Sequence, residues 1–139
     1  MIRMRYSCEG EDISPALIWN DAPAGTGSFA LIMEDPDAPG GTFIHWLLYN
    51  IAKDSTAIPE NVPRSGNTPG GYSQGTNSFG RVGYNGPCPP HGTVHRYYFY
   101  LYALSADEKI KPALRKNDLM RLMDGKTLGI ASTMRRFGR

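Results

Sequence analysis

Two carboxylates and a histidine flank a short proline- and glycine-rich connection in the sequence. Asp35 and Asp37 stand in the run DPDAPGG, and His45 follows shortly after it. If the apolar runs on either side, residues 28–34 and 43–51, pair as a hairpin, all three side chains lie at one end of a sheet. An ordinary turn also uses Asp, Pro and Gly. Two carboxylates beside a strand histidine nevertheless favour a polar pocket.

A second group of such residues stands at the start of an aromatic run. The proline-rich segment GPCPP at 86–90 leads into His95 and Tyr97. Alternation along a strand places these two side chains on one face. A lone histidine is more often a hydrogen-bonded core residue. The position of His95, at the mouth of a strand and two residues before Tyr97, favours a pocket wall instead.

The chemistry that these residues predict is the binding of a small anion. A neighbouring carboxylate raises the pKa of a histidine and orients its ring, so His45 or His95 can stay protonated and donate a hydrogen bond. A monoprotonated phosphate can give its own proton to an aspartate. Backbone N–H groups of the loops can complete the site.

Catalytic interpretations of other motifs are weaker. The run GYSQG around Ser73 fits the serine-hydrolase elbow, but its flanks are loops instead of a strand and a helix. The run GTGSFA fits a dinucleotide fingerprint, yet it introduces a strand. Cys88 as a thiol nucleophile lacks oxyanion donors, because its neighbours are prolines without N–H groups. A small hydrolase that uses His95 or Cys88 with Asp35 stays open as the alternative function.

Metal and cofactor chemistry has little support in the sequence. His91 and His95 have the spacing of a zinc pair on a helix. On an extended segment four residues span about 13 Å, which is too far to share a metal. A metal held by His95 with Asp35 or Asp37 stays open. No cofactor motif is present, and we expect no cofactor.

The elements that must position these residues are mostly strands. The runs 28–34, 43–51 and 95–104 are rich in β-forming residues and are bounded by turns. Ile2–Tyr6 alternates apolar and basic residues, as a half-buried strand does. Between residues 59 and 94, a stretch rich in Gly, Pro and Asn predicts a long functional loop.

The C-terminal part of the chain has a helical pattern. Asn117 is a good N-cap, apolar residues recur on one face after it, and Gly125 is a stop signal. A second short helix is predicted to begin at Thr127. The sequence therefore indicates a β-sheet core with helices at the C-terminal end.

Composition limits the classes of protein and of partner. The 139 residues, 40% hydrophobic and 20% charged, predict one domain over residues 1–139. A net charge of +2 argues against a nucleic-acid partner. The N-terminal residues do not form a signal peptide, and no apolar run reaches membrane-spanning length, so we expect a cytoplasmic protein with no membrane span. Cys8 and Cys88 are accordingly predicted to be free thiols in a reducing cytosol.

Together these motifs resemble the phosphatidylethanolamine-binding protein (PEBP) family, which includes the Raf kinase inhibitor protein. The resemblance covers almost the whole chain, and the compact length is similar to the bacterial and archaeal branch. The segments that carry it are DPDAP at 35–39, His45 with Trp46 and Asn50, GPCPP at 86–90, and His95-Arg96-Tyr97.

The resemblance implies a mostly β fold. This is a PEBP-like β-sandwich with a large central antiparallel sheet, a smaller second sheet and short C-terminal helices. It also implies a small cavity at one sheet edge for phosphate, acetate-like anions or a phospholipid head group. Carried over by motif, the ligand-binding residues are Asp35, Asp37, His45, Cys88, Pro90, His95 and Tyr97.

The resemblance further implies a non-enzymatic binding or regulatory protein that inhibits a kinase or protease partner, with a homodimer left open. Longer members close the pocket with a C-terminal helix that bears a tyrosine, whereas this chain has no tyrosine after Tyr102. The proline-rich motifs predict a cis bond at Ala38-Pro39 or Pro89-Pro90. Protonated histidines predict that anion affinity weakens as the pH rises above about 6.5.

Overall fold

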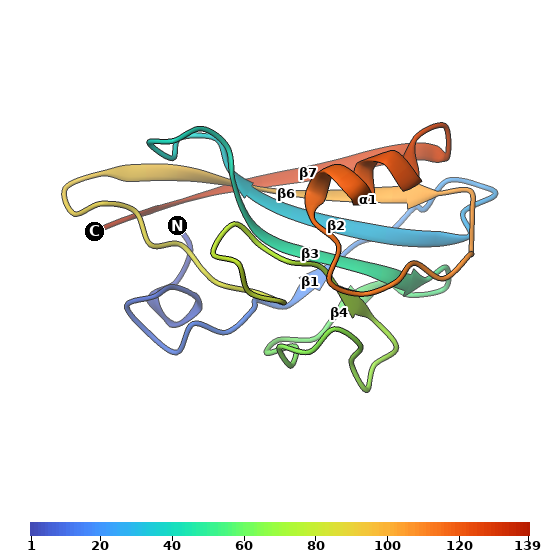
Figure 1. Cartoon of the computed structure of the whole chain (residues 1–139), viewed down its shortest axis with the longest axis horizontal. Helices are drawn as coiled ribbons and strands as arrows, with labels where there is room; N and C mark the ends of the chain where they lie inside the picture. Colours follow the sequence, from blue (N-terminus) through green and yellow to red (C-terminus); the bar gives the residue numbers. More distant parts are fainter.

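The computed structural model describes residues 1–139 and places seven strands in two antiparallel sheets (Figure 1). The larger sheet has the strand order β5-β3-β2-β6-β7, and the smaller sheet pairs β1 with β4. The mostly β, two-sheet architecture predicted from the sequence is therefore confirmed. The strands are β1 (Leu17–Ile18), β2 (Ser28–Asp35), β3 (Phe43–Ala52), β4 (Ala57–Ile58), β5 (Ser73–Gln74), β6 (Val94–Leu104) and β7 (Thr127–Gly138).

The strands β2, β3 and β6 bring the predicted site residues to one end of the larger sheet. The expected hairpin of β2 and β3 is confirmed, with Asp35 opposite Phe43 in the register. β6 pairs antiparallel with the other side of β2, so the start of β6 lies beside the end of β2. The chain thus places His45 near the start of β3 and His95 near the start of β6, both next to Asp35.

The prediction of a second helix from Thr127 is wrong, because this segment is the strand β7. It pairs with β6 along nearly its whole length, from Val94 opposite Gly138 to Leu104 opposite Thr127. The open edge of β6 supplies backbone partners for the entire segment, and Gly129 weakens a helix at this place. Tertiary pairing therefore overrides the local helical pattern.

The prediction of a strand over Ile2–Tyr6 is also wrong. Residues Met4–Tyr6 form a short 3-10 helix, η1, after a single backbone bond from the N–H of Ile2 to the carbonyl of Arg136, 2.8 Å long. The predicted cis bond is wrong as well, because every peptide bond is trans. The turns at Ala38-Pro39 and Pro89-Pro90 are therefore made by trans bonds.

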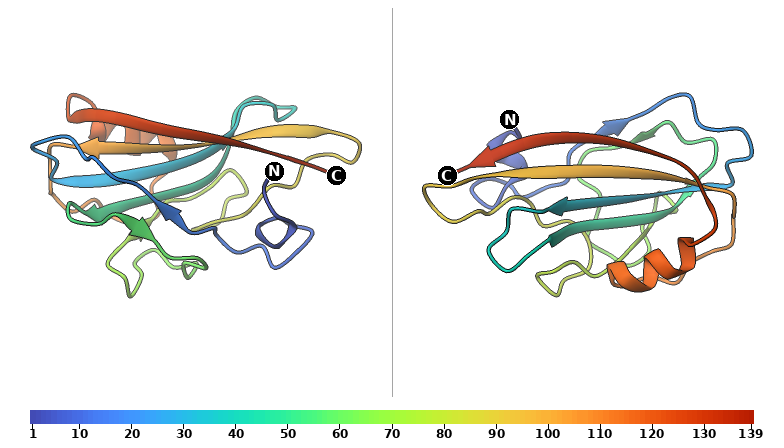
Figure 2. Two further views of the ribbon diagram at one scale, coloured as in Figure 1. Left: turned by 180° about the vertical axis from the view of Figure 1, so that it is seen from behind. Right: turned by 90° about the horizontal axis from the view of Figure 1, so that it is seen from above.

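One helix and the small sheet cover opposite faces of the large sheet. The predicted helix is confirmed as α1 (Lys116–Met123), but Asn117 is not its N-cap: the N-cap is Arg115, and Asn117 lies within the first turn. Its buried residues Leu119 and Met123 pack on the outer face of β2 and β3. β1 and β4 pack on the other face (Figure 2). The core is therefore a sandwich centred on β2 and β3.

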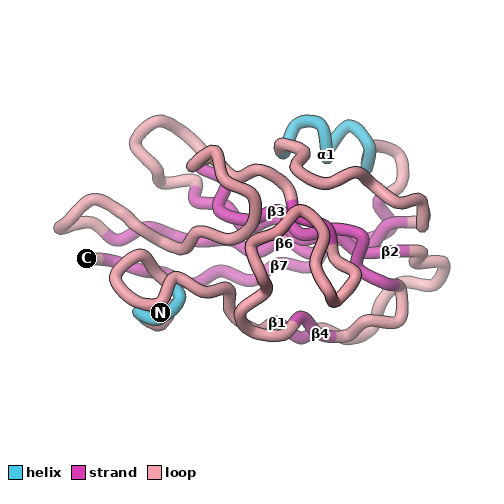
Figure 3. The backbone as a smooth tube through the Cα atoms, turned by 60° about the horizontal axis from the view of Figure 1, so that its bottom comes forward, coloured by secondary structure: helices cyan, strands magenta, loops and turns pink.

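The long stretch between residues 59 and 94 contains the two-residue strand β5 and is otherwise loop (Figure 3). Buried amide side chains replace the missing sheet bonds. Gln74 accepts a hydrogen bond from Trp46 Nε1 at 2.8 Å and donates to the carbonyls of Pro63 and Ser65. Asn77 donates to the side chain of Asn85 at 2.8 Å. These bonds fix the loop that passes the end of the large sheet.

Candidate functional site

A pocket of about 230 Å³ opens at the end of the large sheet, where β2 ends and β3 and β6 begin. Six of the seven predicted ligand-binding residues line it. Larger hollows exist elsewhere, such as one of about 350 Å³ beside residues 50–54, but they contain no histidine. The lining residues are Asp35, Ala38, Pro39, Phe43, His45, Phe79, Cys88, Pro89, Pro90, His95 and Tyr97.

Asp35 and His95 form a buried pair in the pocket wall. His95 Nδ1 lies 2.6 Å from Asp35 Oδ2, and only 3% of Asp35 and 6% of His95 are exposed. Asp35 Oδ1 accepts the backbone N–H of Asp37 at 2.7 Å. Because the carboxylate accepts from Nδ1–H, His95 has only Nε2 left to offer to a molecule in the pocket.

His45 has a different role from the one expected. Its Nδ1 lies 2.7 Å from the carbonyl oxygen of Asn85, which can only accept, so Nδ1 carries a proton. Burial lowers the pKa of His45, although the Asn85 carbonyl and the charge of Asp35 oppose this shift. The imidazole is therefore neutral at neutral pH, and its Nε2 is a hydrogen-bond acceptor. The expectation that His45 stays protonated is corrected by its burial.

Sequence reasoning missed Asn85, whose carbonyl orients His45. Its position follows from bonds between distant segments: its side chain accepts from Asn77 and donates to Asp12 Oδ2 at 3.4 Å. Phe79, which lies edge-on to the His45 ring at 5.6 Å between centroids, was also missed. Both residues lie in the long loop, where no local periodicity indicates a contact with β3.

Tyr97 contributes a hydroxyl that has no partner in the protein. The residue is buried, and its ring lies edge-on to His45 at 5.3 Å. Burial and the charge of Asp35 raise the pKa of the phenol, so it keeps its proton. A buried hydroxyl without a partner carries an energetic cost that a bound molecule or water would remove.

Asp37 is the predicted site residue that does not line the pocket. Its Oδ1 accepts from Arg96 Nη2 at 2.7 Å, and its Oδ2 accepts from Arg96 Nε and from the Arg96 backbone N–H, both at 2.9 Å. The guanidinium and the backbone N–H lower the pKa of Asp37 to about 2. Asp37 therefore ties the β2–β3 turn to β6, which holds the pocket edge in place.

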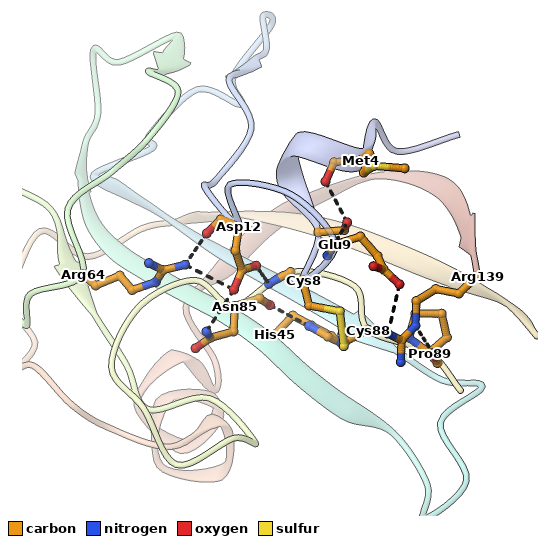
Figure 4. The surroundings of a disulfide bond; sticks show 12 residues. Met4, Cys8, Glu9, Asp12, His45, Arg64, Asn85, Cys88, Pro89 and Arg139 are labelled. Carbon is orange, nitrogen blue, oxygen red and sulfur yellow. Dashed lines mark hydrogen bonds and ion pairs between the residues drawn. A yellow bond between two sulfur atoms is a disulfide. The ribbon is translucent and has the colours of Figure 1, made fainter. Parts of the chain in front are cut away.

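Cys8 and Cys88 are joined in a disulfide, so the prediction of two free thiols is wrong (Figure 4). The partners are 80 residues apart in sequence and their Cα atoms are 5.4 Å apart, a proximity that the chain's fold creates. A disulfide sulfur is not a nucleophile, so Cys88 cannot serve the alternative hydrolase in this state. The expected cytosolic location, from which the free thiols are inferred, therefore does not predict the state of these two cysteines.

The remaining sequence motifs have structural roles or isolated positions. The Ser73 hydroxyl donates to Asn67 Oδ1 and accepts from Asn50 Nδ2, in place of a catalytic base. No three metal-capable side chains gather into one cluster. The single α-helix, α1, is too short to cross a membrane.

The comparisons with known proteins agree with one another. Residues 1–138 match the family model described as phosphatidylethanolamine-binding protein. A UPF0098 protein of Methanothermobacter thermautotrophicus is 49% identical over 130 residues, which are 94% of this chain and 85% of that protein. The crystal structure of a PEBP homologue from Chlamydia trachomatis has a TM-score of 0.89 and 36% identity, covering 99% of this chain and 89% of its own. E. coli YbcL has a TM-score of 0.86 and 33% identity, covering 96% and 85%.

Proposed function

Because this chain belongs to the phosphatidylethanolamine-binding protein family, we propose that it is a non-enzymatic binding protein for a small oxyanion that carries a proton. The chemical class is a phosphate monoanion or phosphomonoester, free or as a lipid head group. The observation that carries the proposal is the convergence of two histidines with unlike partners, His45 and His95, on one pocket.

The two rings support a ligand that both donates and accepts. Neutral His45 offers the lone pair of Nε2, which accepts the P–OH proton of a monoprotonated phosphate. In its doubly protonated form His95 donates from Nε2 to a phosphate oxygen, while Asp35 balances the charge. The Tyr97 hydroxyl can serve in either sense. A fully deprotonated anion has no proton to donate, so its oxygens would be repelled by the lone pair on His45 Nε2.

The regulatory part of the proposal is that occupancy of the pocket alters binding to a kinase or protease. Its support is the family resemblance and the position of the pocket at the surface. The proline-rich wall at Pro89 and Pro90 and the turn at Pro39 frame the opening, so a ligand there changes what a partner contacts.

Isothermal titration with phosphate, O-phosphoserine, sulfate and acetate tests the pocket. We expect His45→Ala and His95→Ala each to weaken phosphate binding tenfold to a hundredfold, since a charge-assisted hydrogen bond contributes about 1.5–3 kcal/mol. His91→Ala is the matched control, because His91 is exposed and does not line the pocket. Unchanged affinity in both pocket variants would contradict the proposal.

A hydrolase remains the second candidate, and one observation favours it. The Asp35–His95 pair, 2.6 Å apart, has the geometry of a general base with its orienting carboxylate. The wild type and His95→Ala should be compared on a panel of ester and phosphoester substrates. Turnover that is lost in the variant would favour the enzyme over the binding protein.

A further inference from the structure

The disulfide forms part of the pocket wall. Cys88 lines the pocket and is half-buried, whereas Cys8 follows η1 and is exposed. Figure 4 shows the two sulfurs between the N-terminal segment and the loop that carries Pro89. A thiol in solution therefore reaches Cys8 more readily than Cys88. Because Cys88 lines the pocket, breaking this bond alters the pocket wall.

The loop around Cys88 depends on contacts from other segments. Pro87, Pro89 and Pro90 have no N–H groups, so the loop has little backbone bonding of its own: the Thr93 N–H donates to the Pro90 carbonyl at 3.1 Å. The Pro87 carbonyl accepts the Cys8 N–H at 3.1 Å, and the Pro89 carbonyl accepts from Arg139 Nε at 2.7 Å.

The N-terminal segment makes further polar contacts in this region. Asp12 Oδ1 accepts the Gly86 N–H at 2.7 Å, and Glu9 pairs with Arg139 at 3.1 Å. These polar contacts place the loop against the N-terminal segment, but the disulfide is the covalent tie. Its loss leaves the Cys88 side of the wall held only by these hydrogen bonds and by the packing of Pro87 and Pro89, which are buried.

We propose that the Cys8–Cys88 disulfide is a site of thiol–disulfide exchange with a small thiol, and that exchange opens the pocket wall. The thiolate of the small molecule attacks Cys8 Sγ, a new S–S bond forms there, and the Cys8–Cys88 bond breaks. Cys88 leaves as a thiolate and takes a proton from water. The products are a mixed disulfide on Cys8 and a free thiol on Cys88, with no net oxidation or reduction.

The consequence for the ligand rests on the proposed oxyanion pocket, whereas the exchange itself does not. A released Cys88 leaves the Pro89–Pro90 wall with fewer restraints, and its thiolate form adds negative charge beside an anion site. If the wall keeps its binding-competent position a tenth of the time, oxyanion affinity falls about tenfold.

The experiment uses the intact oxidised chain with glutathione as the thiol. After incubation under native conditions, free thiols are capped with iodoacetamide and the adducts are mapped by mass spectrometry. We expect glutathione on Cys8 and the cap on Cys88, and neither in a Cys8→Ser/Cys88→Ser double variant. Titration with O-phosphoserine before and after incubation measures the expected tenfold loss.

Single variants separate the two causes of that loss. Cys8→Ser leaves a thiol in the pocket wall, and Cys88→Ser removes the tie without leaving one. A tenfold loss of O-phosphoserine affinity in both variants assigns the effect to the missing disulfide. A larger loss in Cys8→Ser shows that the negative charge of the free Cys88 thiolate also weakens binding. If a variant fails to fold, the glutathione-treated wild type still decides the question.

The outcomes distinguish this proposal from the proposed function. Glutathione on Cys88, or no adduct at all, overturns the exchange site. Glutathione on Cys8 with unchanged O-phosphoserine affinity overturns the link to the pocket. If the untreated protein binds no oxyanion, the proposed function fails and the link fails with it, while the adduct map still decides the exchange site by itself.

Discussion

The neutral state of His45 changes the reason for which anion affinity should fall as the pH rises. The sequence attributes this fall to loss of a proton from the histidines, whereas the structure attributes it to loss of a proton from the ligand. His45 is 3% exposed, its Nδ1–H is committed to the Asn85 carbonyl, and burial lowers its pKa. From about pH 6.5 upward, the unperturbed value, the ring is therefore neutral and can only accept through Nε2. The pocket then depends on a proton that the ligand carries.

The expected result is that O-phosphoserine binds more weakly as the pH rises through the second pKa of its phosphate, about 6. The loss is that of one charge-assisted hydrogen bond to His45, about 1.5–3 kcal/mol, or tenfold to a hundredfold in affinity. The fall should be complete within one to two pH units above that pKa, because the fraction of monoanion drops about tenfold per unit. Tyr97 does not contribute, since burial and Asp35 raise the pKa of its phenol.

Isothermal titration from pH 5 to 9 at constant ionic strength measures this effect. Sulfate is the matched control: it does not titrate in this range, so any slope in its curve reports the protein's own groups. Dividing the O-phosphoserine curve by the sulfate curve isolates the ligand proton. A ratio that stays flat from pH 5 to 9, or that rises with pH, would refute the role given to His45. In His45→Ala the ratio should be flat.

Three further predictions concern stability. The folded-state pKa of His45 lies below the unfolded value of about 6.5, so the unfolded chain binds more protons as the pH falls. The free energy of unfolding should therefore decrease as the pH drops below about 6.5, by at most about 1.4 kcal/mol per pH unit. Urea unfolding at pH 7 and 5.5 should show this decrease in the wild type and a smaller one in His45→Gln. Asp37→Asn should lower stability by about 0.5–1 kcal/mol at pH 7, since the ion pair with Arg96 is partly exposed. That cost should vanish as the pH falls from 3.8 to about 2, and phosphate affinity should change less than twofold; a tenfold loss of affinity would make Asp37 a ligand contact. The Cys8–Cys88 disulfide closes a loop of 80 residues, so its full reduction should lower the free energy of unfolding by about 4 kcal/mol. Calorimetry should then show a Tm lower by about 10 °C, and a shift under about 3 °C would contradict the disulfide's stabilising role.

Much of the fold follows from local patterns that a sequence displays directly. The β2–β3 hairpin is predictable because two β-rich runs are joined by a short Pro/Gly turn, and antiparallel pairing then brings Asp35 near His45. Alternation in β6 sets His95 and Tyr97 on one face. The helix α1 follows from its apolar face and from the Gly125 stop.

The errors occur where a long-range partner competes with a local pattern. Thr127 begins a strand and not a helix, because the edge of β6 offers backbone partners that no local rule counts. Ile2–Tyr6 has strand-like alternation, but after Ile2 no strand edge pairs with it. In both places the sheet edge, which is a property of the assembled fold, decides the conformation.

The sequence by itself determines that Asp35 and His45 lie at one end of a hairpin and that His95 and Tyr97 share one strand face, because hairpin pairing and alternation act over a few residues. Only the tertiary structure decides what those side chains do. Burial and the Asn85 carbonyl make His45 an acceptor, and Arg96 draws Asp37 out of the pocket lining. The approach of two segments 80 residues apart turns Cys8 and Cys88 into a covalent tie. Protonation, ion pairing and disulfide formation depend on distance and on solvent exposure, and these are set only when the whole chain has packed.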